Sequence, residues 1–314
     1  MPLISVCIPT LNDQKSLVHN LDLLCKKKDL SIEILVCDDC LDNTIFSIIE
    51  KYQSKLKIQY FKGDKVSLDG ALIKLIEKSS GDYIWFLGDD LLLPDSLDNV
   101  TKILSERENL VFLWINSHSA SDGKLTFNIS NDIYFTDRDR LLDFDIGLLG
   151  FISATVFKRE SALPSITKAK LHIGSSFACL YIIMFVLSVE GNLGIFSKSC
   201  FKSREKPSGE VRWYEQYQVF GLNLYDIVVQ FDNVFSSGAL REALSRNLTR
   251  TLKSIIYERA IGLKTGFALE HISIKPMFLK YYNFKQFWFF LPLLILPRFI
   301  LRSLYKIFKI LGSK

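Results

Sequence analysis

Three short polar clusters in the N-terminal third of the chain carry side chains suited to a phosphorylated, charged ligand. Each follows an apolar run directly, and they are Pro9-Thr10-Leu11-Asn12, Asp38-Asp39 and Gly88-Asp89-Asp90. Carboxylates in such places cannot serve a core, because burying an unpaired charge is costly. Oxygen ligands are those that Mg²⁺ prefers, and a divalent cation can neutralise a departing diphosphate. We therefore expect Asp89 and Asp90 to hold Mg²⁺ or Mn²⁺, and Asp39 to accept hydrogen bonds from a nucleobase or ribose.

The apolar pattern around these clusters predicts strands and helices in alternation. Strands are expected at 4–8, 32–37, 58–61, 83–87 and 110–115, with helices at 14–27, 44–54, 68–78 and from Pro94 to about 107. Such alternation predicts an α/β fold in which helices flank a mostly parallel sheet. Ligands bind such sheets at the carboxyl ends of the strands, where the three polar clusters lie.

The pattern weakens beyond residue 116. It predicts a short helix within 137–145, an edge strand at 153–158, a buried helix at 171–187 and amphipathic helices at 212–231 and 239–263. The C-terminal region should therefore be helical.

The net charge of +5 is concentrated in the C-terminal tail. From His271 to the end there are eight Lys or Arg and no Asp or Glu, so the remainder has 31 basic and 34 acidic residues. A nucleic-acid-binding face would not distribute charge in this way, and we expect no nucleic-acid partner. The six cysteines are scattered, the Cys37-x-x-Cys40 pair stands alone, and Met1 leads directly into a strand. These features favour free thiols and a cytoplasmic location.

The tail itself combines an apolar run with basic residues. The run at 287–296 contains Pro292 and is shorter than the ~20 apolar residues of a transmembrane helix. In the following segment, Arg302, Lys306 and Lys309 lie opposite an apolar face. This pattern predicts a basic amphipathic helix on a membrane surface. The alternative is a C-terminal helix that packs on the protein and has a solvated basic face.

Three stretches of the chain, in order and at matching spacing, resemble family 2 glycosyltransferases, which have the GT-A fold. Residues 5–12 resemble their opening strand, and 33–39 with Asp42-Asn43-Thr44 resemble their nucleotide-binding loop. Residues 81–90, with Pro94 four residues on, resemble the strand that delivers their metal-binding Asp-x-Asp. The Tyr-x-Trp-x-Leu-Gly-Asp-Asp sequence is similar to the branch that includes abequosyltransferases and other O-antigen enzymes.

The resemblance implies roles for individual residues and a reaction. It assigns Pro9, Thr10, Asn12 and Asp39 to the nucleotide, and Asp89 with Asp90 to the metal and diphosphate. It implies transfer of a sugar, with inversion, from a nucleotide-diphosphate sugar to a lipid-linked saccharide in surface polysaccharide or O-antigen synthesis. Such enzymes commonly act at the cytoplasmic face of the cell membrane, which agrees with a peripheral tail.

The chain departs from the family pattern at several positions, two of which concern the metal and the catalytic base. The first Asp of Asp-x-Asp falls on Leu87, and the region matching the Glu-Asp catalytic base, Gly174–Phe177, contains no carboxylate. His172 is the nearest titratable side chain and is the candidate base; a histidine hydrogen-bonded at a helix start is the alternative. Arg204 is a candidate for closing over the diphosphate on a mobile loop, or else belongs to a solvated basic linker.

These features suggest four regions along the chain. They are a nucleotide-sugar-binding half at 1–116, an acceptor-side part of the same domain at 117–200, a helical region at 201–280 and the membrane-surface tail at 281–314. Two other functions compete with glycosyl transfer. A nucleotidyltransferase would show a Gly-rich, basic phosphate loop near the N-terminus, which is missing. A catalytically impaired nucleotide-sugar-binding or membrane scaffold protein fits the missing base and the altered Asp-x-Asp.

Overall fold

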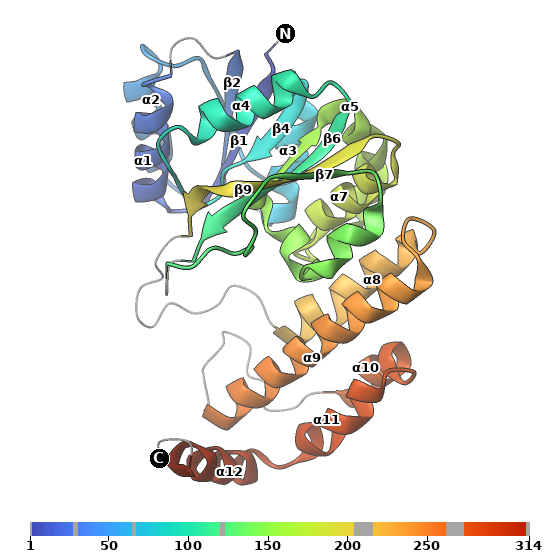
Figure 1. The fold of residues 1–314 in the computed structure, drawn as a ribbon. Helices are drawn as coiled ribbons and strands as arrows, with labels where there is room; N and C mark the ends of the chain where they lie inside the picture. Colours follow the sequence, from blue (N-terminus) through green and yellow to red (C-terminus); the bar gives the residue numbers. More distant parts are fainter. Residues whose placement is uncertain are drawn as a thin grey trace. The chain divides into compact units, whose positions relative to one another are not determined.

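A computed structural model of the chain describes residues 2–27, 31–64, 67–119, 123–203, 216–261 and 273–311. The chain divides into two units (Figure 1). One, here called the α/β unit, contains Met1–Arg138 and Leu149–Lys206. The other, called the helical unit, contains Asp139–Leu148 and Pro207–Lys314. The short segment at 139–148 thus leaves the first unit to join the second.

One mixed sheet forms the centre of the α/β unit. Within the described residues its strands are β1 Ile4–Thr10, β2 Ile32–Asp38, β3 Ile58–Lys62, β4 Tyr83–Phe86, β5 Leu91–Leu92, β6 Leu110–His118, β7 Ile133–Phe135, β8 Thr155–Lys158 and β9 Asn192–Lys202. Their order is β3-β2-β1-β4-β8-β6-β9-β5, with β7 also paired to β9. The first four strands are mutually parallel, as predicted, whereas β8 is antiparallel to both β4 and β6.

Helices cover both faces of this sheet, which explains why its central strands are continuous apolar runs. The longer ones are α1 Gln14–Leu24, α2 Thr44–Tyr52, α3 Leu68–Lys78, α4 Ser96–Glu106 and α7 Ala178–Ser188. Figure 1 shows α3 and α7 on one face and α1, α2 and α4 on the other. The largest fully buried side chains of the sheet include Trp85 in β4 and Trp114 in β6. Short helices α5 Arg159–Ala162 and α6 Ile166–Ala169 follow β8.

Two predicted elements differ from the structure. The edge strand expected at 153–158 is wrong, because β8 lies inside the sheet between β4 and β6. The helix expected at 171–187 starts later, at Ala178, because Gly174 and Ser176 have φ of 90° and 66°. Such left-handed backbone interrupts a helix, and residues 170–172 form a separate 3₁₀ turn.

The helical unit consists of packed helices of uneven length. A π-helical stretch at Gln216–Asn223 leads into α8 Leu224–Val228, followed by α9 Ser237–Ile261, α10 Ile274–Tyr281, α11 Lys285–Ile295 and α12 Arg298–Leu311. The helix predicted at 239–263 is therefore confirmed as α9. In the described part of the chain no single helix has both the length and the apolarity to span a membrane; α11 and α12, bent by 103°, meet those criteria only as a pair.

Candidate functional site

The candidate site lies where the strand order of the sheet reverses. From β1 the chain proceeds outward to β2 and β3, and then crosses to β4 on the other side of β1. Such a switch point leaves a crevice at the carboxyl ends of the strands, which is where ligands of open α/β sheets bind. The parallel register pairs Thr10 with Asp38 and Cys7 with Phe86. The three polar clusters that follow β1, β2 and β4 therefore share one edge of the sheet.

The loops after β1 and β2 are tied together by main-chain hydrogen bonds. The N–H of Asp39 donates to the carbonyl of Thr10 (3.0 Å), and the N–H of Asn12 donates to Sγ of Cys40 (3.0 Å). Asn12 has a left-handed φ of 60°, a conformation in which Asn is enriched. Pro9 is buried inside β1. Thr10 is also buried, and no described residue hydrogen-bonds its Oγ1.

The side chain of Asp38 stabilises these two loops through hydrogen bonds. Its side chain is fully buried and accepts hydrogen bonds from the Tyr60 hydroxyl (2.6 Å), Lys62 Nζ (2.9 Å) and the Cys40 N–H (2.8 Å). Burial alone would raise the pKa of Asp38, but these donors outweigh it and hold the pKa below its ordinary value. Asp38 is thus an ionised carboxylate that stabilises these two loops.

Asp39 lies against the first residue after β3. A Cβ added to Gly63 would come within 1.8 Å of Asp39 Oδ1 and 2.7 Å of Asp39 Cγ. Gly63 also donates its N–H to the Asp38 carbonyl (2.8 Å). Only a glycine at this position allows the Asp39 carboxylate its present orientation. Sequence reasoning missed this residue, although a glycine directly after a strand at the ligand edge was visible.

The third cluster continues β4 into an exposed acidic turn. Leu87 is fully buried and donates its N–H to the Cys7 carbonyl (2.9 Å), so it extends the pairing with β1. Gly88 donates its N–H to Oγ of the buried Ser153 (3.1 Å), a residue that sequence reasoning missed. Asp89 is exposed, whereas Asp90 is buried. Asp89 is therefore the carboxylate of this cluster that solvent or a ligand can reach.

A divalent cation fits this arrangement only if the ligand helps to bind it. No group of three or more His, Cys, Asp or Glu in the described ranges is placed to hold a metal ion by itself. Mg²⁺ commonly binds through one or two carboxylates together with waters and substrate phosphates. One exposed carboxylate, Asp89, at the strand ends where we expect the ligand, suits that mode. Burial raises the pKa of Cys37 to about 12, so this thiol is protonated at neutral pH.

The region expected to hold a catalytic base is organised by a carboxylate from α3. Asp69 is buried and accepts hydrogen bonds from the N–H groups of Gly174 (2.9 Å), Ser176 (2.9 Å) and Ala178 (3.0 Å). Burial raises the pKa of Asp69, and these hydrogen bonds only partly offset that rise. His172, half-buried, stacks on the ring of Tyr181 at 4.8 Å. Sequence reasoning missed Asp69, because nothing in its local pattern points to a loop a hundred residues away.

Arg204 lies outside the described residues. The strand that precedes Arg204 is β9, which ends at Lys202. This strand pairs with β5, and β5 begins two residues after Asp89.

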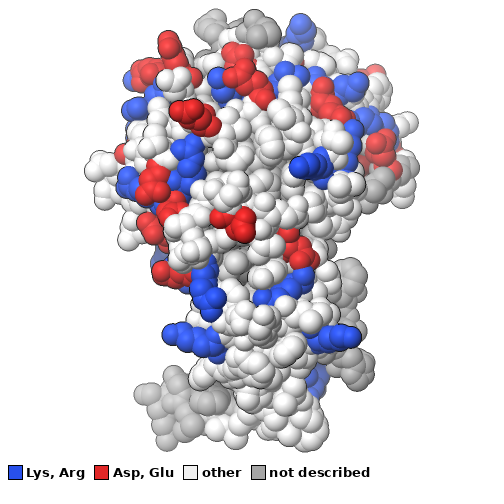
Figure 2. Space-filling model, turned by 90° about the vertical axis from the view of Figure 1, so that its right-hand side faces the viewer, with Lys and Arg blue, Asp and Glu red and all other residues white. Residues whose placement is uncertain are grey.

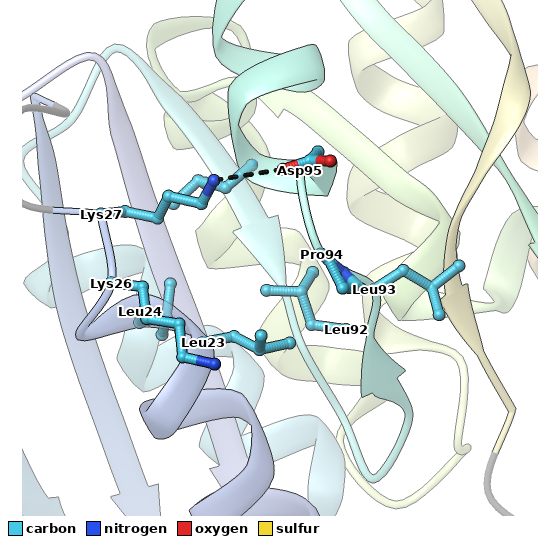
Figure 3. Close-up of a pocket in the computed structure, with 9 residues that line it drawn as sticks. Leu23, Leu24, Lys26, Lys27, Leu92, Leu93, Pro94 and Asp95 are labelled. Atoms are coloured by element: carbon cyan, nitrogen blue, oxygen red, sulfur yellow. Dashed lines mark ion pairs between the residues drawn. The ribbon is translucent and has the colours of Figure 1, made fainter.

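A small cavity adjoins the other end of α1. It has a volume of about 150 Å³ and lies between Leu23–Lys27 and Leu92–Leu97. Its walls are largely leucine side chains, and Lys27 reaches across it to Asp95 (3.5 Å; Figure 3). Drug-sized ligands occupy pockets of about 300–1,000 Å³, and no predicted site residue lines this one. We therefore place the ligand site at the strand ends and not in this cavity.

A mixed sheet flanked by helices, with acidic loops at its switch point, defines a GT-A-like nucleotide-binding fold. The chain belongs to glycosyl transferase family 2, whose family model matches residues 5–162, just over half of its length. It is therefore a glycosyltransferase by family, as the sequence motifs predicted.

Named relatives agree with this family and with the predicted branch. The chain is 28% identical over 176 residues to the Escherichia coli UDP-Glc:alpha-D-GlcNAc-diphosphoundecaprenol beta-1,3-glucosyltransferase WfgD, covering 54% of this chain and 68% of that protein. It is 24% identical over 217 residues to the Salmonella typhimurium abequosyltransferase RfbV, covering 61% and 63% respectively. The fold matches that of Staphylococcus aureus TarS 1–349 in complex with UDP-GlcNAc, with a TM-score of 0.62 at 17% identity, over 85% of this chain and 77% of that one.

Proposed function

We propose that this chain transfers a sugar, with inversion, from a nucleoside-diphosphate sugar to a lipid-linked saccharide in surface polysaccharide synthesis. The observation that supports the proposal is that the strands preceding Asp39 and Asp89 lie on either side of β1 and have their carboxyl ends at the same side of the sheet. The name of the relative WfgD, which includes a diphosphoundecaprenol-linked acceptor and a UDP-linked donor, supports the lipid-linked part.

In this proposal each loop holds one part of the donor. Asp39 accepts hydrogen bonds from the base or ribose, and the buried hydroxyl of Thr10 and the loop at Asn12 line the same place. Asp89 would help to hold a divalent cation beside the diphosphate, and Asp90 is the buried residue that follows it. The cation would stabilise the departing diphosphate electrostatically. Leu11 and Leu41 are exposed beside these loops and offer apolar surface to the base.

His172 is our candidate for the general base that deprotonates the acceptor hydroxyl. It precedes a loop that Asp69 holds in place, and that loop supplies no carboxylate of its own. An imidazole titrates near neutral pH and is a common general base.

We further propose that the C-terminal helices hold the protein at the cytoplasmic face of a membrane. Exposed apolar side chains lie on α10, α11 and α12 and at the end of α10: Leu279, Tyr282, Trp288, Phe289, Ile295, Phe299 and Ile307. The exposed cations Lys285, Arg302 and Lys306 lie among them, and no acidic residue follows His271. Figure 2 shows white and blue, and no red, over the lowest part of the drawn face, where these helices lie. Aromatic and basic residues together suit an interface with anionic lipid.

The test of the donor site is a thermal-shift screen against UDP, GDP, CDP and dTDP, each with and without Mn²⁺. A nucleotide at a hundred times its Kd should stabilise the protein by about 2.7 kcal/mol. We expect one nucleotide to raise the Tm by several degrees, with a larger rise when Mn²⁺ is present. Asp89→Ala should remove the Mn²⁺-dependent part and abolish transfer while preserving the Tm of the free protein, because an exposed strand-end carboxylate contributes little to the core.

Glu160→Ala is the matched control for this screen. Glu160 is an exposed carboxylate that follows β8, and the antiparallel register of β8 and β4 places it at the opposite edge of the sheet. It should respond to nucleotide and Mn²⁺ like the wild type. If no nucleotide shifts the wild-type Tm, the donor site is misplaced, and a scaffold role gains support from the loop that lacks a carboxylate. An equal Mn²⁺ response in Asp89→Ala would remove Asp89 from the cation site.

A further inference from the structure

The segment after β4 that carries Asp89 and Asp90 is hydrogen-bonded to a buried amide side chain on α1. Asn20 is fully buried. Its Nδ2 donates to the carbonyl of Asp90 (3.0 Å), and its Oδ1 accepts the N–H of Leu92 (2.9 Å). A primary amide can donate to one main-chain group through its nitrogen and accept from another through its oxygen. Asn20 therefore pairs with the segment as a neighbouring strand would.

Further contacts show that the segment has little freedom of its own. On the α1 side, His19 Nε2 lies 2.9 Å from the Leu92 carbonyl. On the other side, the Cys200 carbonyl of β9 accepts hydrogen bonds from the N–H of Leu93 (2.9 Å) and from Ser96 Oγ (2.6 Å). The turn at Gly88 and Asp89 precedes these contacts, and Ser153 Oγ accepts the Gly88 N–H (3.1 Å). The orientation of Asp89 consequently depends on where α1 and β9 hold the residues that follow it.

Helix α1 also begins at the nucleotide loop. Its N-cap, Asp13, accepts the N–H of Ser16 (3.2 Å) and directly follows Asn12. Two helical turns later, the same helix presents Asn20 to Asp90. One rigid element thus connects the loop assigned to the nucleotide with the segment assigned to the cation.

We propose that Asn20 is a positioning residue for cation-assisted binding of the diphosphate: it fixes Asp89 relative to the nucleotide loop without contacting either ligand. This inference rests on the proposed function, since it presumes that Asp89 serves a cation. Loss of residues that orient metal ligands typically costs 10–100-fold in metal affinity or activity. Asn20 should therefore influence the cation more than the nucleotide.

The experiment measures UDP affinity by calorimetry at increasing Mn²⁺ for the wild type, Asn20→Leu and Asn20→Asp. Leucine has a similar volume but removes both hydrogen bonds, whereas aspartate keeps the acceptor for Leu92 and repels the Asp90 carbonyl. We expect the Mn²⁺ concentration at half-effect to rise at least 10-fold in both variants. The UDP affinity of both variants without metal should stay within about twofold of the wild-type value. A general destabilisation of the fold would instead weaken UDP binding with and without metal. If Asn20→Leu does not fold, Asn20→Asp at low temperature carries the test.

Asn247→Leu is the matched control. Asn247 is also buried and also donates to a main-chain carbonyl, that of Phe220 (3.0 Å), but it belongs to α9 of the helical unit. It should lower the Tm and leave the Mn²⁺ response unchanged. A normal Mn²⁺ response in the Asn20 variants, at a lowered Tm, would overturn the inference and leave the proposed function intact. A wild type whose UDP binding ignores Mn²⁺ would overturn the cation role of Asp89 and the inference with it.

Discussion

Substitution of Gly63 by alanine should disable the nucleotide site through a residue that touches no nucleotide. The new Cβ would lie 1.8 Å from Asp39 Oδ1, and real Cβ contacts are essentially never shorter than 3.0 Å. The oxygen must therefore retreat by about 1.2 Å even to reach that limit. A displacement of this size breaks a hydrogen bond between Asp39 and a base or ribose.

The expected loss follows from the strength of that hydrogen bond. Hydrogen bonds to charged groups contribute about 1.5–3 kcal/mol. The Kd for the nucleotide should rise about 10- to 150-fold, since 1.4 kcal/mol is a factor of ten. The fold should tolerate the change, because the backbone of Gly63 is not in the left-handed region and the Asp39 carboxylate is a side-chain end that can swing away. We expect the free energy of unfolding to change by less than about 1 kcal/mol.

Calorimetric titration with the nucleotide identified by thermal shift measures this effect. Gly238→Ala is the control, because an added Cβ there has no neighbour within 4 Å. A double variant, Gly63→Ala with Asp39→Ala, should bind no more weakly than Asp39→Ala alone, since both changes remove the same interaction. Wild-type affinity in Gly63→Ala would refute the reasoning and show that the Asp39 carboxylate does not contact the ligand in this orientation.

Two further predictions concern stability and membrane binding. Asp38→Asn should lower the free energy of unfolding at pH 7 by about 1–3 kcal/mol, because the three hydrogen-bond donors to the buried Asp38 lose an ionised acceptor. The folded-state pKa of Asp38 is lowered, so its contribution to stability is present above the unfolded-state pKa and is lost as the pH falls through the folded-state pKa. Urea unfolding at several pH values should therefore show the free energies of unfolding of the wild type and the variant converge in acid. A difference between them that stays constant with pH would contradict this. Reversing Arg302 and Lys306 to glutamate should reduce binding to vesicles with anionic lipid by at least about 30-fold, at roughly 1 kcal/mol for each basic residue removed and more for reversal. Co-sedimentation with vesicles measures this binding, and Lys198→Glu in the α/β unit is the control. Unchanged binding of the Arg302 and Lys306 variant to vesicles would indicate that α12 packs on protein instead.

The sequence was sufficient for the parts of the fold that depend on local pattern. The parallel half, β1 to β4 with α1 to α3, was predicted because each buried strand is a short apolar run and each helix repeats its apolar positions. The sequence could not place β8 within the sheet. Its partners lie far away in the chain, so the apolar run alone does not show whether the strand has one neighbour or two.

The candidate site divides in the same way. Asp39 and Asp89 could be identified because polar residues directly after buried strands have no role in a core. Their supports were missed: Gly63, Ser153 and Asn20 act through contacts with residues 24 to 72 positions away. Asp69 was missed for the same reason, since its three partners lie more than a hundred positions along the chain.

The interior position of β8 also has a consequence for how the chain is made. Strands β1 to β4 can pair as soon as they leave the ribosome. The other edge of β4 stays unpaired until β8, roughly seventy residues later in the chain, has been synthesised. At about 5–20 residues per second, that edge stays open for about 4–14 s. An unpaired apolar strand edge can pair with another chain. Aggregation during synthesis should therefore depend on this interval, and slow codons between the two strands should lower the yield of soluble enzyme while the stability of the finished protein stays the same.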